Sequence, residues 1–331
     1  MNVINENFHH SHAAHCESGV AASLMTHHGT RISEAMAFGL SSAIAFAYLP
    51  FVKLGGFPLI AYRMPPKHIL KGVVKPFGAR FRFEKFRDEA EGMRRLDELL
   101  AQGHIVGLQT SAFWLPYFPK DMRFHFNAHN LLVYGKEGDE YLISDPVAEM
   151  PVRCVADALQ KARFARGLMA PKGLLYYPET IASGEVSAQD IRKAIRKTAR
   201  IMSSPIPIIG PHGIRMLARR IARLSKTDKL SLNYVGHIIR MQEEIGTGGA
   251  GFRFLYAAFL QEAASITSIP ELNGLAENLN EIGDGWREFA LKTVRMIKGR
   301  DPFEPGVIAD LLRNQADQEE NFFRALKRAV A

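Results

Sequence analysis

Cys16, one of only two cysteines in the chain, stands where a cysteine could act as a nucleophile. It follows the histidine-rich stretch "HHSHAAH" and precedes "ESGVAASLMTHH", residues 17–28, which predict a helix that stops at Gly29. The unpaired backbone N–H groups and the dipole at the start of a helix stabilise a thiolate. A histidine that takes the thiol proton, and a carboxylate that orients this histidine, would complete the chemistry.

A predicted β-hairpin supplies both partners. Two apolar runs, residues 131–134 and 141–143, flank the turn sequence "GKEGDE". His129 precedes the first strand and Asp145 follows the second, so both lie at the open end of the hairpin, where cross-strand neighbours are about 5 Å apart. A nucleophile at a helix start, with its base on a sheet, is the general layout of papain-like enzymes.

The segments around these residues predict a mixture of helices and strands. Residues 57–64 and 78–86 have the composition of strands, and residues 87–103 have helical periodicity. Residues 35–52 are apolar and without charge, but they include serines and a proline. A membrane span needs about 20 strongly apolar residues. We therefore expect a buried helix running into a strand, and no membrane span.

The length of 331 residues and a hydrophobic content of 47% favour two domains with real cores. Residues 1–182 predict an α+β domain, whereas residues 183–331 show only helical periodicity and predict an all-α domain. Two cysteines make no disulfide framework, and the N-terminus has no secretory pattern. We expect a cytoplasmic protein.

Three stretches resemble a known family. The stretch "HHSHAAHCESGVAASLMTHHGTRISEAMAFGL" resembles the opening of the butirosin biosynthesis protein H N-terminal family, and "RFHFNAHNLLVYG" with "YLISDP" resembles its second motif. The later stretch "EEIGTGGAGFRFLYAAFLQEAA" is similar to the helical domain of unknown function that often follows. The resemblance covers nearly the whole chain and implies a papain-like fold related to cysteine peptidases that process bacteriocin leaders.

The resemblance also implies an activity. The type protein of the family moves an aminoacyl group from the phosphopantetheine thioester of an acyl carrier protein onto an aminoglycoside amine. By motif position, the resemblance assigns Cys16 as nucleophile, His129 as base and Asp145 as the group that orients the base. The predicted helix start and the predicted hairpin indicate the same three residues.

The neighbours of these residues leave several interpretations open. His10 lies six residues before Cys16, where related peptidases place a glutamine as oxyanion donor; a histidine N–H could donate instead, beside the Cys16 backbone N–H. Glu17 could contribute to the oxyanion site or its surroundings, or it could bind free N–H groups at the helix start. Asn127 could orient an imidazole or cap a loop. The histidines lack a second ligand pair at zinc spacing, so we expect no metal. Cys154 is expected to be structural.

The formal net charge of +8 favours acidic partners. Arg215, Arg219 and Arg223 recur every four residues, so they are predicted to share one helical face. We expect this face, or a basic surface beside the Cys16 cleft, to dock an acidic acyl carrier protein. No recognised nucleic-acid motif occurs, and we expect no nucleic-acid partner. The sequence leaves self-association into a homo-oligomer open.

The glycine-rich stretch "TGGAGFR", residues 247–253, predicts a tight turn between two helices of the second domain. It is not a phosphate-binding loop of the Walker type, because it lacks the Gly-Lys-Ser/Thr ending. Contact between Arg253 and the phosphate of a phosphopantetheine arm is the functional alternative to a purely structural turn.

These features predict an acyltransferase of specialised metabolism or lipid biosynthesis. Cys16 would take an acyl or aminoacyl group from a carrier-bound or coenzyme A-type phosphopantetheine thioester, and pass it to a small-molecule amine or hydroxyl. No permanently bound cofactor is expected, because the thioester supplies the activation. The first alternative is a cysteine hydrolase (a peptidase, amidase or thioesterase) with the same three residues. The second is a basic binding module without catalysis.

Overall fold

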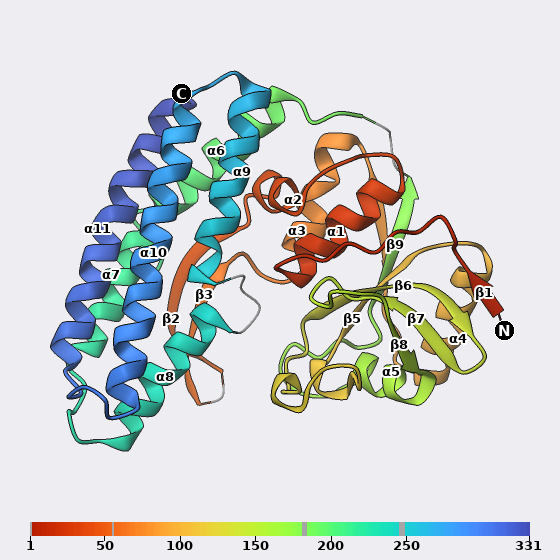
Figure 1. Ribbon diagram of the computed structural model, residues 1–331, viewed down its shortest axis with the longest axis horizontal. Helices are drawn as coiled ribbons and strands as arrows, with labels where there is room; N and C mark the ends of the chain where they lie inside the picture. The colour runs from red at the N-terminus through yellow and green to blue at the C-terminus, as the bar shows by residue number, and fades with distance from the viewer. Residues whose placement is uncertain (1, 55, 181–183, 245–248) are drawn as a thin grey trace. The chain divides into compact units, whose positions relative to one another are not determined.

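The structure is a computed structural model that describes residues 2–54, 56–180, 184–244 and 249–331 (Figure 1). Each of its two compact units is built from two stretches of chain. The first unit contains Met1–Ala37 and Pro66–Val186, and the second contains Phe38–Pro65 and Ser187–Ala331. The predicted domains, residues 1–182 and 183–331, are each continuous in the sequence, whereas residues 38–65 here belong to the second unit.

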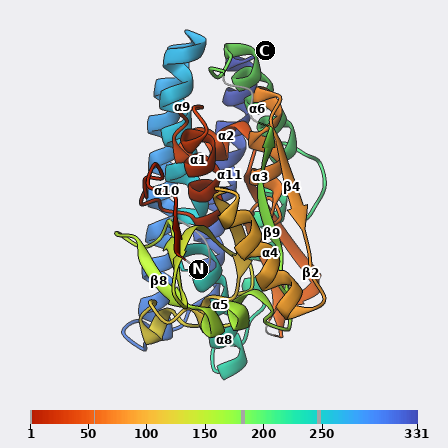
Figure 2. The ribbon, with the colours of Figure 1, turned by 90° about the vertical axis from the view of Figure 1, so that its right-hand side faces the viewer.

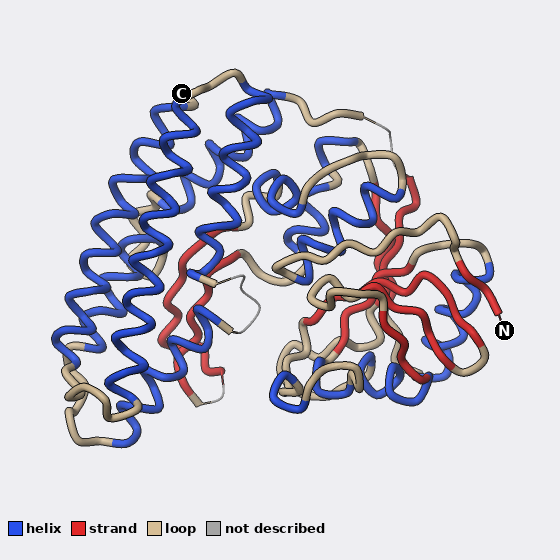
Figure 3. The backbone as a smooth tube through the Cα atoms, viewed as in Figure 1, coloured by secondary structure: helices blue, strands red, loops and turns tan. Residues whose placement is uncertain are grey.

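An antiparallel seven-stranded sheet organises the first unit (Figure 3). Its strands follow the order β4-β9-β5-β6-β7-β8, and β1 also pairs with β6. The strands are β1 (Asn2–Ile4), β4 (Arg80–Glu84), β5 (Val106–Thr110), β6 (His129–Glu137), β7 (Glu140–Ser144), β8 (Val152–Val155) and β9 (Leu175–Thr180).

Helices cover this sheet (Figures 1 and 2). The apolar side of α4 inserts Leu96 and Leu100 among Leu108 and Val133 of the sheet, as its periodicity predicted. The helices that begin in this unit are α1 (Cys16–His27), α2 (Glu34–Leu40), α3 (His68–Val73), α4 (Glu89–Ala101) and α5 (Ala156–Arg163), with short 3-10 turns η1 (Lys75–Phe77), η2 (Ala112–Trp114) and η3 (Lys120–Met122).

The β6–β7 hairpin has the predicted form. Val133 pairs with Ile143 and Glu137 pairs with Glu140, so the strands turn at Gly138, whose φ of 59° suits glycine. His129 is the first residue of β6, and Asp145 directly follows the last residue of β7. Both therefore lie at the open end of the hairpin, as predicted from the sequence.

The apolar stretch after residue 34 is a short helix followed by a strand, as expected. Helix α2 ends at Leu40, and β2 (Ile44–Leu54) then pairs antiparallel with β3 (Phe57–Arg63). Within the described part of the chain, no helix is long and apolar enough to cross a membrane.

The β2–β3 hairpin belongs to the second unit because aromatic side chains anchor it there. The ring centroid of Trp286 lies 6.1 Å from that of Phe46 and 5.7 Å from that of Tyr62, and all three side chains are buried. Burial of such rings contributes strongly to a core. The sequence analysis missed this packing because the partners are more than 200 residues apart.

The second unit is otherwise helical, as predicted for the chain after residue 183. Long helices α10 (Glu271–Ile297) and α11 (Pro305–Ala329) pack on each other, and α11 also packs on α7 (Gly210–Ile221) (Figure 1). Its further helices are α6 (Ala188–Met202), α8 (Lys229–Glu243) and α9 (Arg253–Thr267), with the 3-10 turn η4 (Ala250–Phe252).

Candidate active site

Cys16 is the first residue of α1 and is only 4% exposed. His15 forms the N-cap in an extended conformation, and its side chain accepts the backbone N–H of Ser18. The first N–H groups of a helix have no acceptor within the helix. The Cys16 thiol and its own backbone N–H thus both belong to the positive end of α1.

A close backbone approach brings α1 to the open end of the hairpin. The backbone N–H of Ala13 donates to the carbonyl of Pro146 at 2.7 Å, directly after Asp145. A Cβ atom on Gly19 would lie 2.6 Å from the Pro146 Cβ, which is closer than real Cβ contacts. Glycine at this position therefore allows the nucleophile helix to reach the turn that carries Asp145.

His129 and Asp145 form a buried pair. The Nε2 atom of His129 lies 2.6 Å from the Asp145 Oδ2 atom. Asp145 also accepts the Tyr117 hydroxyl at 2.7 Å and the Val147 backbone N–H at 3.2 Å. The sequence analysis missed Tyr117, which lies in the aromatic and proline-rich stretch between β5 and β6 and carries no local sign of a site.

Electrostatics favour the protonated form of His129. Burial alone would lower its pKa, but the charge and hydrogen bond of Asp145, together with a hydrogen bond and charge attraction from Cys16, raise the pKa to about 10. Since Nε2 binds Asp145, Nδ1 is the ring nitrogen that remains for the thiol. The structure thus brings Cys16, His129 and Asp145 together in the order that nucleophilic catalysis requires.

His10 does not offer an N–H to an oxyanion. Its Nδ1 atom lies 2.8 Å from the Ser144 hydroxyl, and its Nε2 atom lies 3.0 Å from the carbonyl oxygen of Ala148. A carbonyl only accepts, so Nε2 carries the hydrogen and Nδ1 accepts from Ser144. His10 therefore supports the residue before Asp145 and leaves the Cys16 backbone N–H as the donor from this segment.

The other two predicted neighbours also have different partners. Glu17 is fully buried, and its Oε1 atom accepts the backbone N–H of Ile69 at 3.0 Å, at the start of α3 rather than of its own helix. Asn127 donates to the carbonyl oxygens of Arg166 and Leu168, at 3.2 and 2.9 Å. The Asn127 amide thus fixes the loop before β9 and does not orient the imidazole.

A further carboxylate, Glu34, lies beside the nucleophile and was missed from the sequence. It accepts the backbone N–H groups of Ala14 and His15 and the hydroxyl of Ser18. Burial raises the pKa of Glu34, against the effect of these hydrogen bonds. An acidic residue in the first turn of a helix is common, so the sequence position of Glu34 did not indicate a role at the site.

The second cysteine, Cys154, has the features of a buried structural residue. It lies on β8, is 1% exposed, and burial raises the pKa of its thiol to about 12. A thiol of this kind is inert at neutral pH. Over the described ranges, no cluster of three or more histidine, cysteine or acidic side chains could hold a metal ion.

The predicted basic face on α7 is smaller than expected. Arg215 is held by Asp317 and Glu320 of α11, each at 2.6 Å, so its charge is largely neutralised. Arg219 is exposed on the helix, but α7 ends at Ile221, and the exposed Arg223 lies beyond it. The three arginines therefore do not form one free helical face.

Arg253 is not available to a phosphate in this structure. Its guanidinium is fully buried and pairs with Glu319 at 2.7 Å, and Glu319 also accepts the indole N–H of Trp286. Residues 247 and 248 of the glycine-rich stretch lie outside the described residues. The described part, which ends in η4, makes a left-handed turn into α9.

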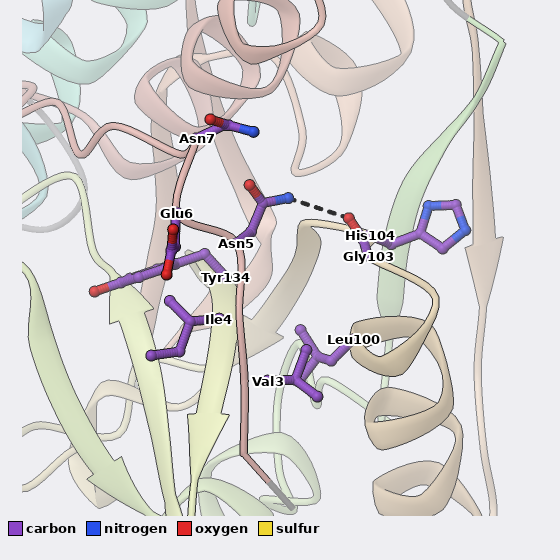
Figure 4. A pocket seen from close by; sticks show the side chains of 9 residues that line it. All are labelled: Val3, Ile4, Asn5, Glu6, Asn7, Leu100, Gly103, His104 and Tyr134. Atoms are coloured by element: carbon purple, nitrogen blue, oxygen red, sulfur yellow. Dashed lines mark hydrogen bonds between the residues drawn. The ribbon is translucent and has the colours of Figure 1, made fainter.

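A shallow cavity of about 340 Å³ lies elsewhere in the first unit (Figure 4). The Asn5 side-chain amide in its wall donates to the Gly103 carbonyl at 3.2 Å. None of Cys16, His129 and Asp145 lines it. The lining residues are Val3, Ile4, Asn5, Glu6, Asn7, Leu100, Gly103, His104 and Tyr134.

The residues of this site lie within a stretch that matches a known family. Residues 15–146 match the family described as "Butirosin biosynthesis protein H, N-terminal", and residues 157–326, more than half of the chain, match "Domain of unknown function (DUF4872)". The chain belongs to the DUF4872 family and carries a butirosin biosynthesis protein H N-terminal domain. This confirms the resemblance noted from the sequence. With the buried group of Cys16, His129 and Asp145, it indicates a cysteine-based acyltransferase or hydrolase of biosynthesis.

Among solved structures, that of a C39-like peptidase from Bacillus anthracis matches with 14% sequence identity and a TM-score of 0.38. The match covers 55% of this chain and 99% of the peptidase. A score this low supports no argument about activity, which rests on the residues described above. No curated protein matches the chain.

Proposed function

We propose that this DUF4872 protein transfers an acyl group from a phosphopantetheine thioester to an amine or hydroxyl, through an acyl-enzyme on Cys16. The observation that carries the proposal is the buried His129–Asp145 pair, joined by Nε2 and Oδ2 at 2.6 Å, next to a cysteine at a helix start. Such a pair can hold a thiolate and an imidazolium together at neutral pH.

In the first half of the reaction, the Cys16 thiolate attacks the thioester carbonyl carbon. The negative charge that forms on the carbonyl oxygen is stabilised by the Cys16 backbone N–H at the start of α1. The bond between the carbonyl carbon and the donor sulfur then breaks. His129 gives its Nδ1 proton to the departing thiolate, so the carrier leaves as a neutral thiol.

The second half returns the enzyme to its starting state. Neutral His129 takes a proton from the incoming amine or hydroxyl as this attacks the acyl-enzyme. The bond from the acyl carbon to Cys16 breaks, which restores the thiolate beside an imidazolium. Asp145 keeps the imidazole in place throughout, and Tyr117 and the Val147 N–H hold Asp145.

Mass spectrometry of the protein incubated with short acyl thioesters tests the proposal. The expected result is one acyl group on Cys16 that disappears when an amine acceptor is added, with formation of the amide. Cys16→Ala should give no adduct, whereas Cys154→Ala should behave like the wild type. An adduct on the Cys16→Ala protein would contradict the proposal, and release of free acid instead of amide would assign the site to a hydrolase.

For the donor, we propose a carrier-bound thioester. The support is the net charge of +8 and the exposed Arg219 and Arg223, because carrier proteins are acidic. Arg215 has no part in this proposal, since two carboxylates already neutralise it.

A further inference from the structure

The turn before the nucleophile is held by one side chain from the start of α2. Oε2 of Glu34 accepts the backbone N–H of Ala14 at 2.9 Å, and Oε1 accepts the backbone N–H of His15 at 2.7 Å. Oε1 also accepts the hydroxyl hydrogen of Ser18 at 2.9 Å. The three donors lie on both sides of Cys16, so one carboxylate fixes the chain before and after the nucleophile.

These contacts bear on the direction of the Cys16 backbone N–H. The bonds from Ala14 and His15 fix two successive peptide groups before Cys16. The Ser18 contact ties the same carboxylate to the first turn of α1, where Ser18 also contacts the His15 ring at 2.8 Å. A peptide group held on both sides has little freedom to rotate, and its N–H keeps one direction.

This direction matters because two described side chains that the sequence offered near the oxyanion, His10 and Asn127, are engaged elsewhere. Both ring nitrogens of His10 are engaged by Ser144 and Ala148. The Asn127 amide donates to the loop before β9. Of the donors considered from the sequence, the Cys16 N–H is therefore the one that remains to stabilise an oxyanion.

Glu34 is not needed to cap its own helix. The Ser33 hydroxyl accepts the backbone N–H of Met36 at 2.9 Å and caps the start of α2. The Glu34 carboxylate instead reaches back to residues that lie 16 to 20 positions earlier in the chain.

We propose that Glu34 is a positioning residue for catalysis, which holds the Cys16 backbone N–H in the orientation that stabilises the oxyanion. The inference rests on the proposed nucleophilic role of Cys16, but it holds equally for transfer and for hydrolysis. Glu34 acts through the main chain and touches no reacting atom.

Two reagents separate this role from simple support of the fold. p-Nitrophenyl acetate acylates a thiolate through a tetrahedral oxyanion: the acyl carbon bonds to sulfur, and p-nitrophenolate leaves. Iodoacetamide alkylates the same thiolate by displacing iodide, and no oxyanion forms. Loss of a complete oxyanion donor costs about 10²- to 10³-fold in rate. A donor that is only misdirected should cost less.

For Glu34→Gln, we expect acylation of Cys16 by p-nitrophenyl acetate to slow by about 10- to 100-fold, mainly in the rate constant at saturation. A glutamine presents one oxygen and an NH2 group to three donors, so at least one backbone N–H loses its acceptor. Alkylation by iodoacetamide should change by less than about threefold. Ser18→Ala removes one donor and leaves Glu34 in place, and it should slow acylation by a smaller factor in the same selective way.

Glu149→Gln, at an exposed glutamate of the same unit, is the matched control and should react like the wild type with both reagents. Unchanged acylation in Glu34→Gln and Ser18→Ala would overturn the inference. So would an equal loss with both reagents, which would mean general damage to the nucleophile. Failure of the proposed transfer alone would look different: acyl-Cys16 would form normally but would not pass to an amine.

Discussion

Replacement of Asp145 by asparagine tests whether the site holds an ion pair. The pKa of His129 is about 10, against an ordinary value of 6.5, which corresponds to about 5 kcal/mol in favour of the imidazolium. Burial acts in the opposite direction. Without the Asp145 charge, the pKa of His129 should fall below 6.5, and the imidazole should be neutral at pH 7.

The rate of Cys16 alkylation by iodoacetamide, measured from pH 5 to 10, reports this change. In the wild type, His129 stays protonated across the neutral range, so Cys16 should keep a cationic partner there. In Asp145→Asn, the thiol loses its cationic partner. Loss of this cation removes the attraction that favours the thiolate, so alkylation should slow by roughly 10-fold at pH 7 and approach the wild-type rate near pH 10, where His129 of the wild type also loses its proton.

The same pair makes a prediction about stability. A raised histidine pKa stabilises the folded state fully below the unfolded value of 6.5, and this contribution is lost as the pH rises through about 10. The difference in melting temperature between the wild type and Asp145→Asn should therefore shrink from pH 6.5 to pH 10. Asp139→Asn, at the exposed turn of the same hairpin, is the control. Equal alkylation profiles for the wild type and Asp145→Asn would refute the ion-pair argument.

Three further predictions use other contacts. Tyr117→Phe removes a hydrogen-bond donor from Asp145, which should raise the pKa of His129 further and slow acylation by a few fold. An unchanged pH profile of acylation would contradict this prediction. Gly19→Ala places a Cβ atom 2.6 Å from the Cβ atom of Pro146, so it should lower the melting temperature and the acylation rate. Gly274→Ala on α10, where a Cβ atom meets open space, should change neither quantity. Exchange of Arg219 and Arg223 for Glu should slow acylation from a carrier-bound donor, and the effect should be larger at low salt. The rate of acylation from a short free thioester should not change. Equal loss with both donors would point to damage of the fold.

The three central residues could be found from the sequence because each carries a local sign. Cys16 begins a helix that its own pattern predicts, and a hairpin with a clear turn fixes His129 and Asp145 at one end. Tyr117 and Glu34 carry no such sign. Their roles depend on contacts across 28 and 16 to 20 residues of chain, which neither periodicity nor turn chemistry encodes.

The expectations that fell short share one physical cause. His10 has the spacing of an oxyanion donor, but partners more than 130 residues away take both of its ring nitrogens. Glu17 binds the backbone N–H of Ile69, 52 residues later, and Arg215 meets carboxylates more than 100 residues later. The hydrogen-bond partners of polar side chains near a site are set by tertiary packing, and spacing along the chain does not predict those partners.

The assignment of the β2–β3 hairpin to the second unit has a consequence for biosynthesis on the ribosome. Phe46 and Tyr62 leave the exit tunnel early, but Trp286, which packs on both, is made 224 residues after Tyr62. At about 5–20 residues per second, the hairpin waits roughly 11 to 45 s for this partner. Any chain that ends before α10 therefore lacks the indole that packs on these two rings, and neither of the two family matches along the sequence contains all the residues of one compact unit.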